Sequence, residues 1–398
     1  MLTREENERL TRVGPGTPAG ELLRRYWHPV AVAQELSDEQ PTKFVRLLGE
    51  DLVLFKDKAG RVGLLADHCS HRGASLLYGR VEERGIACAY HGWLYDCEGN
   101  ILETPPERNE AIMNSVKHTA YPVQKLAGLY WAYLGPQPAP AVTPYDVLAR
   151  SDGERDITVH PLLDCNWFQT MENAVDPAHA AILHQGAARR AKPVSSTRGF
   201  IDDQVSFDYW LLPFGIMKRE NFWDGQADEH PLLFPNILRI HSHCQIRVPV
   251  DDTHTWRVDV NFRPTPGRVL DPSLDEPEAV YKDPYKDPAD AVHPFTKWQM
   301  GTIPQQDHMA WETQGPITNR TVEHLSFSDR AVVFLRRLTL ENIEKVENGL
   351  DPMSVVRDPN PAIIDTGMPR DLHLTGGRMG RGKPYGAKGA PSQMPASV

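Results

Sequence analysis

Two short segments of the chain each carry one cysteine and one histidine at the spacing of a metal site. The first is Cys69-Ser70-His71 and the second is Cys88-Ala89-Tyr90-His91, with sixteen residues between His71 and Cys88. Two thiolates and two imidazoles on two facing loops suit a [2Fe–2S] cluster, in which the cysteines bind one iron and the histidines bind the other. A structural zinc ion is the alternative, although zinc sites usually space their cysteines as C-x2-C.

A second group of metal-ligand side chains lies in the segment from Asn166 to His184. Asp176 and Pro177 are typical of the start of a helix, and Asp176 and His179 are three apart, so both can lie on one helical turn. His179 and His184 are five apart, which separates them by about 140° in a regular α-helix. If both bind one metal ion, we expect a helix end or a π-type bulge between them.

A metal site with two histidines and open positions for O₂ needs a carboxylate as its third protein ligand. The segment from Gln305 to Gly315 offers two, Asp307 and Glu312, on one predicted helical stretch. The spacing leaves both open as the ligand. The alternative for either carboxylate is a structural role in the helix or an ion pair with Arg320.

The predicted secondary structure that positions these residues changes from helix to strand along the chain. The first forty residues have helical spacing, and the period of the apolar residues changes to two from Phe44 onward. The proline-rich stretch 136–144 predicts a stiff linker. We expect strands at 44–48, 52–55, 62–65, 85–87, 129–133, 205–212, 237–241 and 255–262. We expect helices at 176–184 and 305–314 and from 328 to 348, the last with an apolar stripe and a cap at Ser328-Asp329.

Composition excludes several classes of protein. The net charge of −10 lacks the basic footprint of a nucleic-acid binder. No apolar run reaches the length that spans a bilayer, and the N-terminus has no signal-peptide core, so we expect a cytoplasmic protein without a membrane anchor. Cys97, Cys165 and Cys244 lie outside the two loops, and we expect them to be inert structural thiols.

The first motif resembles the Rieske iron–sulfur family, and Tyr90-His91-Gly92-Trp93 resembles its oxygenase branch. In the respiratory branch of that family each loop carries an extra cysteine, and Ala74 and Tyr90 stand in those places here. Trp93 stands where that branch has a hydroxyl that hydrogen-bonds the cluster. The resemblance therefore implies fewer hydrogen bonds to the cluster and a lower reduction potential, as suits a donor to an oxygenase.

The second group resembles the catalytic domain of Rieske-type aromatic-ring oxygenases, in which two histidines at this spacing bind a mononuclear Fe(II). In the phthalate-dioxygenase-like branch, the aspartate of a Q-D-x4-E segment is the third ligand, which implies Asp307 here and leaves Glu312 as the runner-up. The family also implies that Asp176 connects His179 with the cluster ligand His91 of a neighbouring subunit. This bridge implies a ring of identical subunits, usually a homotrimer or a multiple of it.

The resemblance implies an α+β fold: an all-β Rieske domain and then an α+β catalytic domain with an antiparallel sheet and flanking helices, similar to a helix-grip fold. We expect a helical N-terminal segment packed on the catalytic domain over residues 1–40 and the Rieske domain over 41–145. The catalytic domain is expected over 146–350, followed by an extended, partly flexible tail over 351–398. Residues on segments that could line a substrate pocket are Asn173, Arg198, Leu238, Arg239, His241, His243 and Trp256.

The implied activity is that of an oxygenase component, which hydroxylates a small aromatic substrate, expected to be carboxylated, with O₂. The chain has no glycine-rich dinucleotide motif, so electrons from NAD(P)H are expected to come from a separate flavin and iron–sulfur reductase or a ferredoxin. O- or N-demethylation of a methoxy- or methylamino-aromatic is the alternative on the same scaffold. An electron-transfer protein without oxygenase activity is the alternative from another class.

Overall fold

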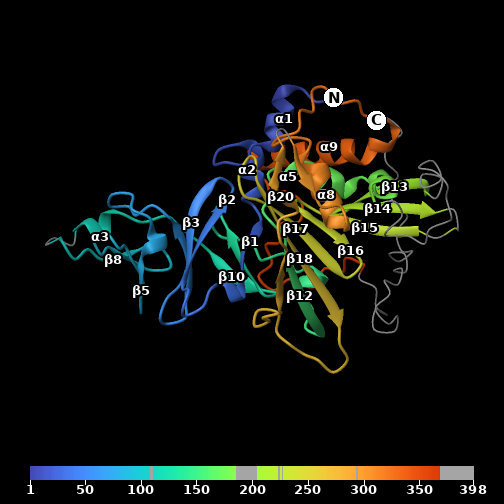
Figure 1. The fold of residues 1–398 in the computed structure, drawn as a ribbon. Helices are drawn as coiled ribbons and strands as arrows, with labels where there is room; N and C mark the ends of the chain where they lie inside the picture. The colour runs from blue at the N-terminus through green and yellow to red at the C-terminus, as the bar shows by residue number, and fades with distance from the viewer. Residues whose placement is uncertain (108–110, 185–203, 223–224, 226, 293–294, 368–398) are drawn as a thin grey trace.

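The structure is a computed structural model, and it describes residues 1–107, 111–184, 204–222, 225, 227–292 and 295–367. Figure 1 shows a narrow lobe with α3, β5 and β8 at its far end and a larger lobe built around a long sheet. The α+β fold with an all-β first part is confirmed. None of the helices in the described part of the chain is long and apolar enough to cross a membrane.

The smaller lobe contains two four-stranded antiparallel sheets, with the strand orders β2-β3-β4-β9 and β5-β6-β7-β8. The strands of the first sheet are Thr42–Leu47 (β2), Glu50–Lys56 (β3), Val62–Ala66 (β4) and Ala120–Tyr121 (β9). Those of the second are Arg80–Glu82 (β5), Gly85–Ala87 (β6), Leu94–Tyr95 (β7) and Ile101–Glu103 (β8), and the short helices nearby are Leu76–Tyr78 (η2) and Ala111–Ser115 (α3). A small core of its own, which includes Phe55, Ile86 and Tyr95, holds the two sheets together.

A three-stranded sheet, β1-β11-β10, joins the lobes. Its strands are Trp27–Val32 (β1), Leu129–Tyr133 (β11) and Val123–Leu126 (β10), and Ala33–Glu35 (η1) follows β1. Every residue of β1 and β11 is buried, and both strands belong to the main core of the molecule. The helical expectation for the first forty residues is therefore wrong from Trp27 onward, because this segment pairs with β11 instead of extending the preceding helix.

The larger lobe is built on an eight-stranded sheet of order β13-β14-β15-β16-β17-β18-β12-β19, antiparallel except for the pair β12 and β19. Its strands are Gln204–Leu212 (β13), Gly215–Phe222 (β14), Ala227–Leu233 (β15), Ile237–Ile240 (β16), His243–Pro249 (β17), Thr255–Pro264 (β18), Gly153–Val159 (β12) and Ala279–Tyr281 (β19). Lys286–Val292 (β20) and Phe295–Trp298 (β21) form a separate hairpin.

Helices cover this sheet on the side that carries α5 and α9 (Figure 1). The helices of this lobe and of the N-terminal segment, within the described residues, are Arg4–Thr11 (α1), Pro18–Leu23 (α2), Asp146–Ala149 (α4), Trp167–Val175 (α5), Ala178–Leu183 (α6), Ile303–Glu312 (α8), Phe327–Asp329 (η3) and Arg330–Glu347 (α9). Helix α5 lies between α9 and strands β16 and β17, and both N-terminal helices contact α9. The apolar stripe predicted for α9 is buried except for the half-buried Val333, and Asp329 stands at the N-cap position, although its side chain accepts from the Ser326 amide and not from α9.

Candidate metal centres

The two Cys–His loops have the same backbone frame. In each, the cysteine carbonyl accepts a hydrogen bond from the glycine four residues later, at 2.8 Å from Gly73 to Cys69 and 2.9 Å from Gly92 to Cys88. Each cysteine N–H also donates, at 2.9 Å, to the carbonyl of the residue after that glycine. Both glycines have φ of 75°, a backbone conformation that other residues rarely adopt. The loops are therefore tight turns that hold each ligand set in place.

The four side chains of these loops point toward one another. The rings of His71 and His91 are 4.6 Å apart, and the thiols of Cys69 and Cys88 are both buried. The Nδ1 atom of His71 is buried and has no hydrogen-bond partner in the described structure. A buried imidazole nitrogen without a partner is costly unless something binds it, so this donor set fits a [2Fe–2S] cluster held by two thiolates and two imidazoles.

Aromatic residues surround the cluster loops. Trp93 stacks on His71 with ring centroids 4.7 Å apart, and Tyr90 packs against His91 at 3.8 Å. The hydroxyl of Tyr95 lies 3.0 Å from Sγ of Cys69, and burial together with this contact raises the pKa of the phenol, so the hydroxyl keeps its proton and would donate to Cys69 if that residue bound a cluster as a thiolate. The contact of Tyr95 with Cys69 was not predicted from the sequence. The tyrosine two residues after Trp93, at the end of a short strand, was the available signal.

The second group of candidate ligands is brought together by two helices that are distant in sequence. His179 on α6, His184 just beyond it and Asp307 on α8 each offer one ligand atom, and these atoms lie within 4.8 Å of one another. Oδ1 of Asp307 is 3.7 Å from Nε2 of His179 and 3.3 Å from Nε2 of His184. Helix α6 ends at Leu183, and His184 follows as its C-cap with φ −90° and ψ 0°. A helix end, and not a π-bulge, brings the two rings to the same place.

Polar side chains lie beside the Nδ1 atoms of both imidazoles, and the one beside His184 is a hydrogen-bond partner. Oδ2 of Asp176 lies 3.4 Å from Nδ1 of His179, and Oε1 of Gln306 lies 2.8 Å from Nδ1 of His184. Asp176 is not the N-cap of α6, which is Pro177, but its Oδ1 accepts a hydrogen bond of 2.8 Å from the Ala178 amide at the start of that helix. Both Nε2 atoms are then left to face the carboxylate. Sequence analysis did not assign a role to Gln306, although it stands directly before Asp307.

The carboxylate of Asp307 has an acceptor oxygen that can bind a cation. Its Oδ1 is buried and accepts no hydrogen bond in the described structure. Two imidazole nitrogens and one carboxylate on one face are the ligand set of non-haem Fe(II) sites, so these residues fit such an ion.

Glu312, the runner-up for the third ligand, lies elsewhere. It forms an ion pair with Lys286 and is not part of the group around Asp307. Arg320 pairs with neither Asp307 nor Glu312 among its described contacts. It instead forms a buried ion pair with Glu172, with Nη2 and Oε2 2.6 Å apart.

Glu172 connects α5 to the elements around it. Its carboxylate also accepts from Nε of Arg336 on α9 at 2.7 Å, and Arg320 in turn donates to Asn7 on α1. Burial opposes ionisation of Glu172, but the two guanidinium groups outweigh it and lower its pKa. This network fixes the helix whose C-terminal end carries Asp176.

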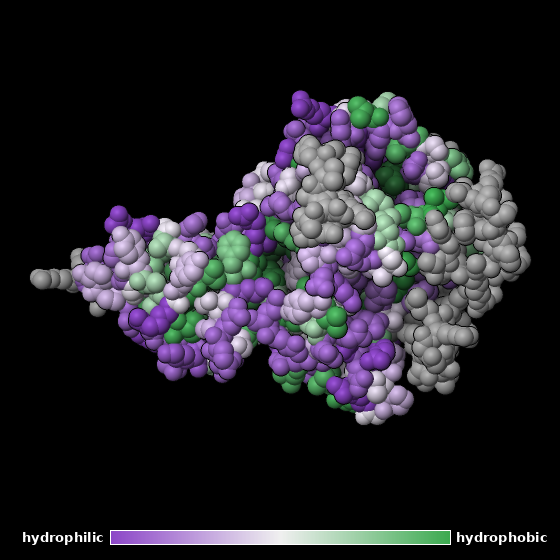
Figure 2. All heavy atoms as spheres, viewed as in Figure 1, coloured by the Kyte–Doolittle hydropathy of each residue, from purple (hydrophilic) through white to green (hydrophobic). Residues whose placement is uncertain are grey.

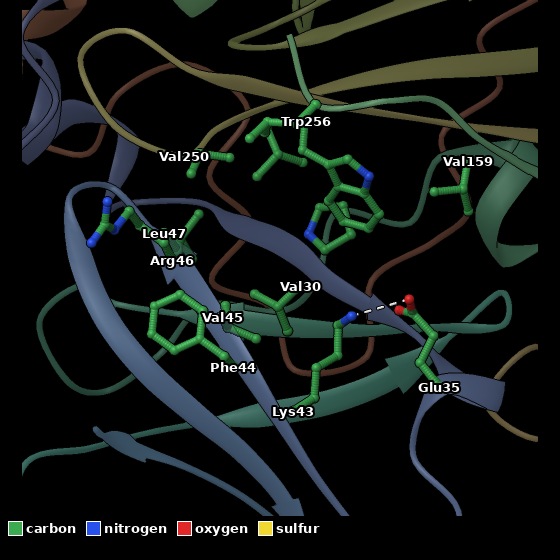
Figure 3. A pocket seen from close by; sticks show the side chains of 13 residues that line it. Val30, Glu35, Lys43, Phe44, Val45, Arg46, Leu47, Val159, Val250 and Trp256 are labelled. Carbon is green, nitrogen blue, oxygen red and sulfur yellow. Dashed lines mark hydrogen bonds and ion pairs between the residues drawn. The ribbon is translucent and has the colours of Figure 1, made fainter. Parts of the chain in front are cut away.

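The residues proposed to line a substrate pocket divide into several environments. Trp256 lines a different cavity of about 370 Å³, which Figure 3 shows between Val30, Val45 and Leu47 on one side and Val159 on the other. Arg239 is engaged with Thr366 at 3.1 Å, and Arg198 lies outside the described residues. The cavity in Figure 3 contains none of the candidate iron ligands, so it is separate from the group around Asp307.

Buried cationic side chains that sequence analysis missed lie beside α8. Arg247 and Arg257 are directly opposite each other on β17 and β18, and their guanidinium groups are 5.2 and 6.0 Å from the ring centroid of Trp311. Arg257 pairs with Asp259 at 2.7 Å, whereas Nε of Arg247 has no partner in the described structure. Their alternation with apolar residues on these strands was the sequence signal.

Comparison with known proteins agrees with this geometry. Residues 26–123 match the Rieske [2Fe-2S] domain, and residues 279–364 match a domain described as LigXa C-terminal domain like. The chain is 37% identical over 390 residues to a 5,5'-dehydrodivanillate O-demethylase oxygenase subunit of Sphingobium, covering 94% of this chain and 89% of the relative. It is 33% identical to a phthalate 4,5-dioxygenase oxygenase subunit of Pseudomonas putida, covering 88% of each chain.

Two further comparisons widen this set. A tert-butanol monooxygenase / tert-amyl alcohol desaturase oxygenase subunit of Aquincola tertiaricarbonis is 46% identical, over 83% of this chain and 75% of the relative. The fold resembles the terminal oxygenase of carbazole 1,9a-dioxygenase from Nocardioides aromaticivorans, with a TM-score of 0.60, 19% identity and coverage of 85% of this chain and 96% of that one. The prediction of an oxygenase related to the phthalate dioxygenases is thereby confirmed. The chain belongs to the Rieske-type oxygenases, as an oxygenase component with a [2Fe-2S] domain.

Proposed function

We propose that this oxygenase component uses O₂ to hydroxylate a carboxylated aromatic substrate, with electrons from NAD(P)H delivered by a separate reductase or ferredoxin in the cytoplasm. The proposal rests on one observation: possible ligand atoms of His179, His184 and Asp307 lie within 4.8 Å of one another, in a chain that also contains a Rieske domain. An electron carrier has no use for this buried group, which counts against the alternative of a protein that only transfers electrons.

Each metal site has its own ligands under this proposal. Cys69, His71, Cys88 and His91 would hold the cluster, and His179, His184 and Asp307 would hold one Fe(II). When bound, the cluster supplies single electrons and the mononuclear iron supplies O₂ activation. The chain would contribute by keeping the ligands fixed, by excluding bulk water around the buried Asp307 and by placing the substrate beside it.

Asp176 is proposed to connect His179 with His91 of the partner subunit in a homotrimer. Its side chain is 24% exposed in the single chain, and one of its oxygens is already directed at His179. Figure 1 places the far end of the small lobe, with β5 and β8, away from α8. Contact between the two sites across a subunit boundary is consistent with this separation.

The proposal of a carboxylated substrate has two supports. Relatives of this chain are named for phthalate, phenoxybenzoate and 3-chlorobenzoate, which are aromatic carboxylates. The buried Arg247 beside α8 has an N–H without an acceptor, and such a group is satisfied by a carboxylate.

O-demethylation is the second candidate, favoured by the full-length similarity to the dehydrodivanillate O-demethylase subunit. Both reactions use the same ligand set, and the pocket decides which substrate carbon is attacked. Product analysis with matched phthalate-, benzoate- and vanillate-type substrates, supplied with O₂ and a generic reductase, separates them. A hydroxylated ring supports the first candidate, and formaldehyde release supports the second. Absence of product from every substrate in the panel contradicts both.

A further inference from the structure

Two neighbouring glutamines on α8 make different contacts. Gln305 belongs to the start of the helix, where its Oε1 accepts from the Thr302 amide at 2.9 Å and its Nε2 donates to Gln299. Gln306 points to the candidate metal centre. Its Oε1 lies 2.8 Å from Nδ1 of His184, and its Nε2 donates to the carbonyl of Met300 at 3.0 Å.

The Met300 carbonyl determines how the amide of Gln306 is oriented. A carbonyl oxygen only accepts hydrogen bonds, so the NH₂ group of Gln306 must face Met300 and its oxygen must face His184. That oxygen also only accepts, so Nδ1 of His184 must carry the proton. Nε2 of His184 is then left with a lone pair, 3.3 Å from the carboxylate oxygen of Asp307.

This arrangement leaves two acceptors facing each other in a buried place. In the other tautomer, Nε2–H of His184 would donate to Oδ1 of Asp307, and the pair would satisfy itself without a cation. With Nδ1 protonated, a cation in the gap between the two acceptors satisfies both. The orientation of one amide therefore decides whether the group is open to a metal ion or closed.

We propose that Gln306 is a positioning residue that selects the Nδ1–H tautomer of His184 and so keeps the site open to its metal ion. The inference rests on the proposed role of His179, His184 and Asp307 as metal ligands. Asp176 stands in the corresponding place beside Nδ1 of His179, at 3.4 Å, whereas Gln306 is within hydrogen-bond distance of His184 at 2.8 Å. Only an acceptor is needed at this position, so Gln306→Glu should retain the function that Gln306→Leu loses.

The test uses the whole protein with its cluster in place and its mononuclear site emptied by a chelator. Co(II) is titrated and followed by the high-spin Co(II) electron paramagnetic resonance signal, while the oxidised cluster stays silent. Gln306→Leu is expected to weaken Co(II) binding by about 10- to 100-fold, and Gln306→Glu by only about threefold. Gln305→Leu is the matched control and should bind as the unmodified protein does, since Gln305 contacts no candidate ligand in the described structure.

A second measurement reports the tautomer directly. In ¹⁵N spectra of histidine-labelled, Co(II)-free protein, His184 should carry its proton on Nδ1 in the unmodified chain and on Nε2 in Gln306→Leu. Co(II) binding by Gln306→Leu equal to that of the control, or an unchanged tautomer, overturns the proposal. Asp307→Ala is included because Co(II) binding that survives this change contradicts the metal site itself, whatever the role of Gln306.

Discussion

The two candidate metal centres of this chain are built in opposite ways. The proposed cluster ligands lie on two turns of a small lobe that has its own core, and each turn is closed by its own backbone hydrogen bonds. The second centre takes its ligands from α6 and α8, and the contact between His184 and Gln306 spans 122 residues of sequence. The first centre depends on local backbone geometry, whereas the second depends on the packing of distant helices.

Because of this difference, we expect each centre to tolerate substitutions that disrupt the other. Changes that loosen α5, α6 or α8 should reach the second centre and leave the cluster in place. Changes in the turns around Cys69 and Cys88 should act on the cluster and leave Asp307 where it is.

Asp307→Ala should abolish product, lowering the rate by at least about a thousandfold, because the only carboxylate of the group in the described structure is lost. The visible spectrum of the [2Fe–2S] cluster should be unchanged. Glu312→Ala is the matched control on the same helix, and it should be milder because Glu312 pairs with Lys286. Full activity of Asp307→Ala together with loss of activity in Glu312→Ala would transfer the ligand role to Glu312.

Asp176→Asn should slow electron delivery between the centres by about a hundredfold. Asparagine retains an oxygen that can accept from the Ala178 amide, so the start of α6 and both metals should survive. The change removes the negative charge beside His179. Stopped-flow mixing of the pre-reduced variant with substrate and O₂ should show a cluster that stays reduced; oxidation at the unmodified rate would refute the bridge.

Glu172→Gln should destabilise the large lobe by about 3 kcal/mol, because it leaves Arg320 and part of the Arg336 contact without their buried anion. Since folding lowers the pKa of Glu172, its contribution is present above the unfolded pKa and is lost as pH falls through the folded one. The unmodified protein should therefore lose more stability than the variant on acidification below about pH 4.5. Urea unfolding at several pH values checks this, with Glu323→Gln, a more exposed partner of Arg336, as the control.

Equal losses in Glu172→Gln and Glu323→Gln would contradict the special position of Glu172. The same experiment also shows which of the two centres loses its metal first. Iron at the second centre should be lost at lower urea concentrations than the cluster absorption in the Glu172 variant, because α5 leads directly to Asp176.

Tyr95→Phe should have the smallest effect. It removes one hydrogen bond to Cys69, worth about 1 kcal/mol, which corresponds to a reduction potential lower by about 40 mV for a one-electron couple. The cluster should remain bound, because none of its four ligands changes. Protein-film voltammetry measures the shift, and an unchanged potential would show that the hydroxyl does not bond the reduced cluster.

The sequence was sufficient to predict the parts of the molecule that depend on local patterns. The start of α9 beside Asp329 and the alternation in β18 each follow from neighbouring residues, and the structure contains both. The strand at Trp27–Val32 could not be predicted in this way, because its partner β11 lies a hundred residues further along the chain.

The second centre was predictable only in part for the same reason. The motif around His179 and His184 indicated a shared ligand role, but spacing could not choose between Asp307 and Glu312. That choice is made by the position of Lys286, which pairs with Glu312, and by the approach of α8 to α6. The role of Gln306 depends on the Met300 carbonyl and on the end of α6, and neither contact leaves a periodic signal in the sequence.

The most direct test of two independent centres is the iron content of anaerobically purified protein, measured together with the cluster spectrum. We predict one iron per chain beyond the two of the [2Fe-2S] cluster, and loss of that additional iron alone in Asp307→Ala, with the cluster spectrum intact. An unmodified protein that contains only the iron of the cluster would contradict the second metal centre. So would an Asp307→Ala variant that retains the additional iron.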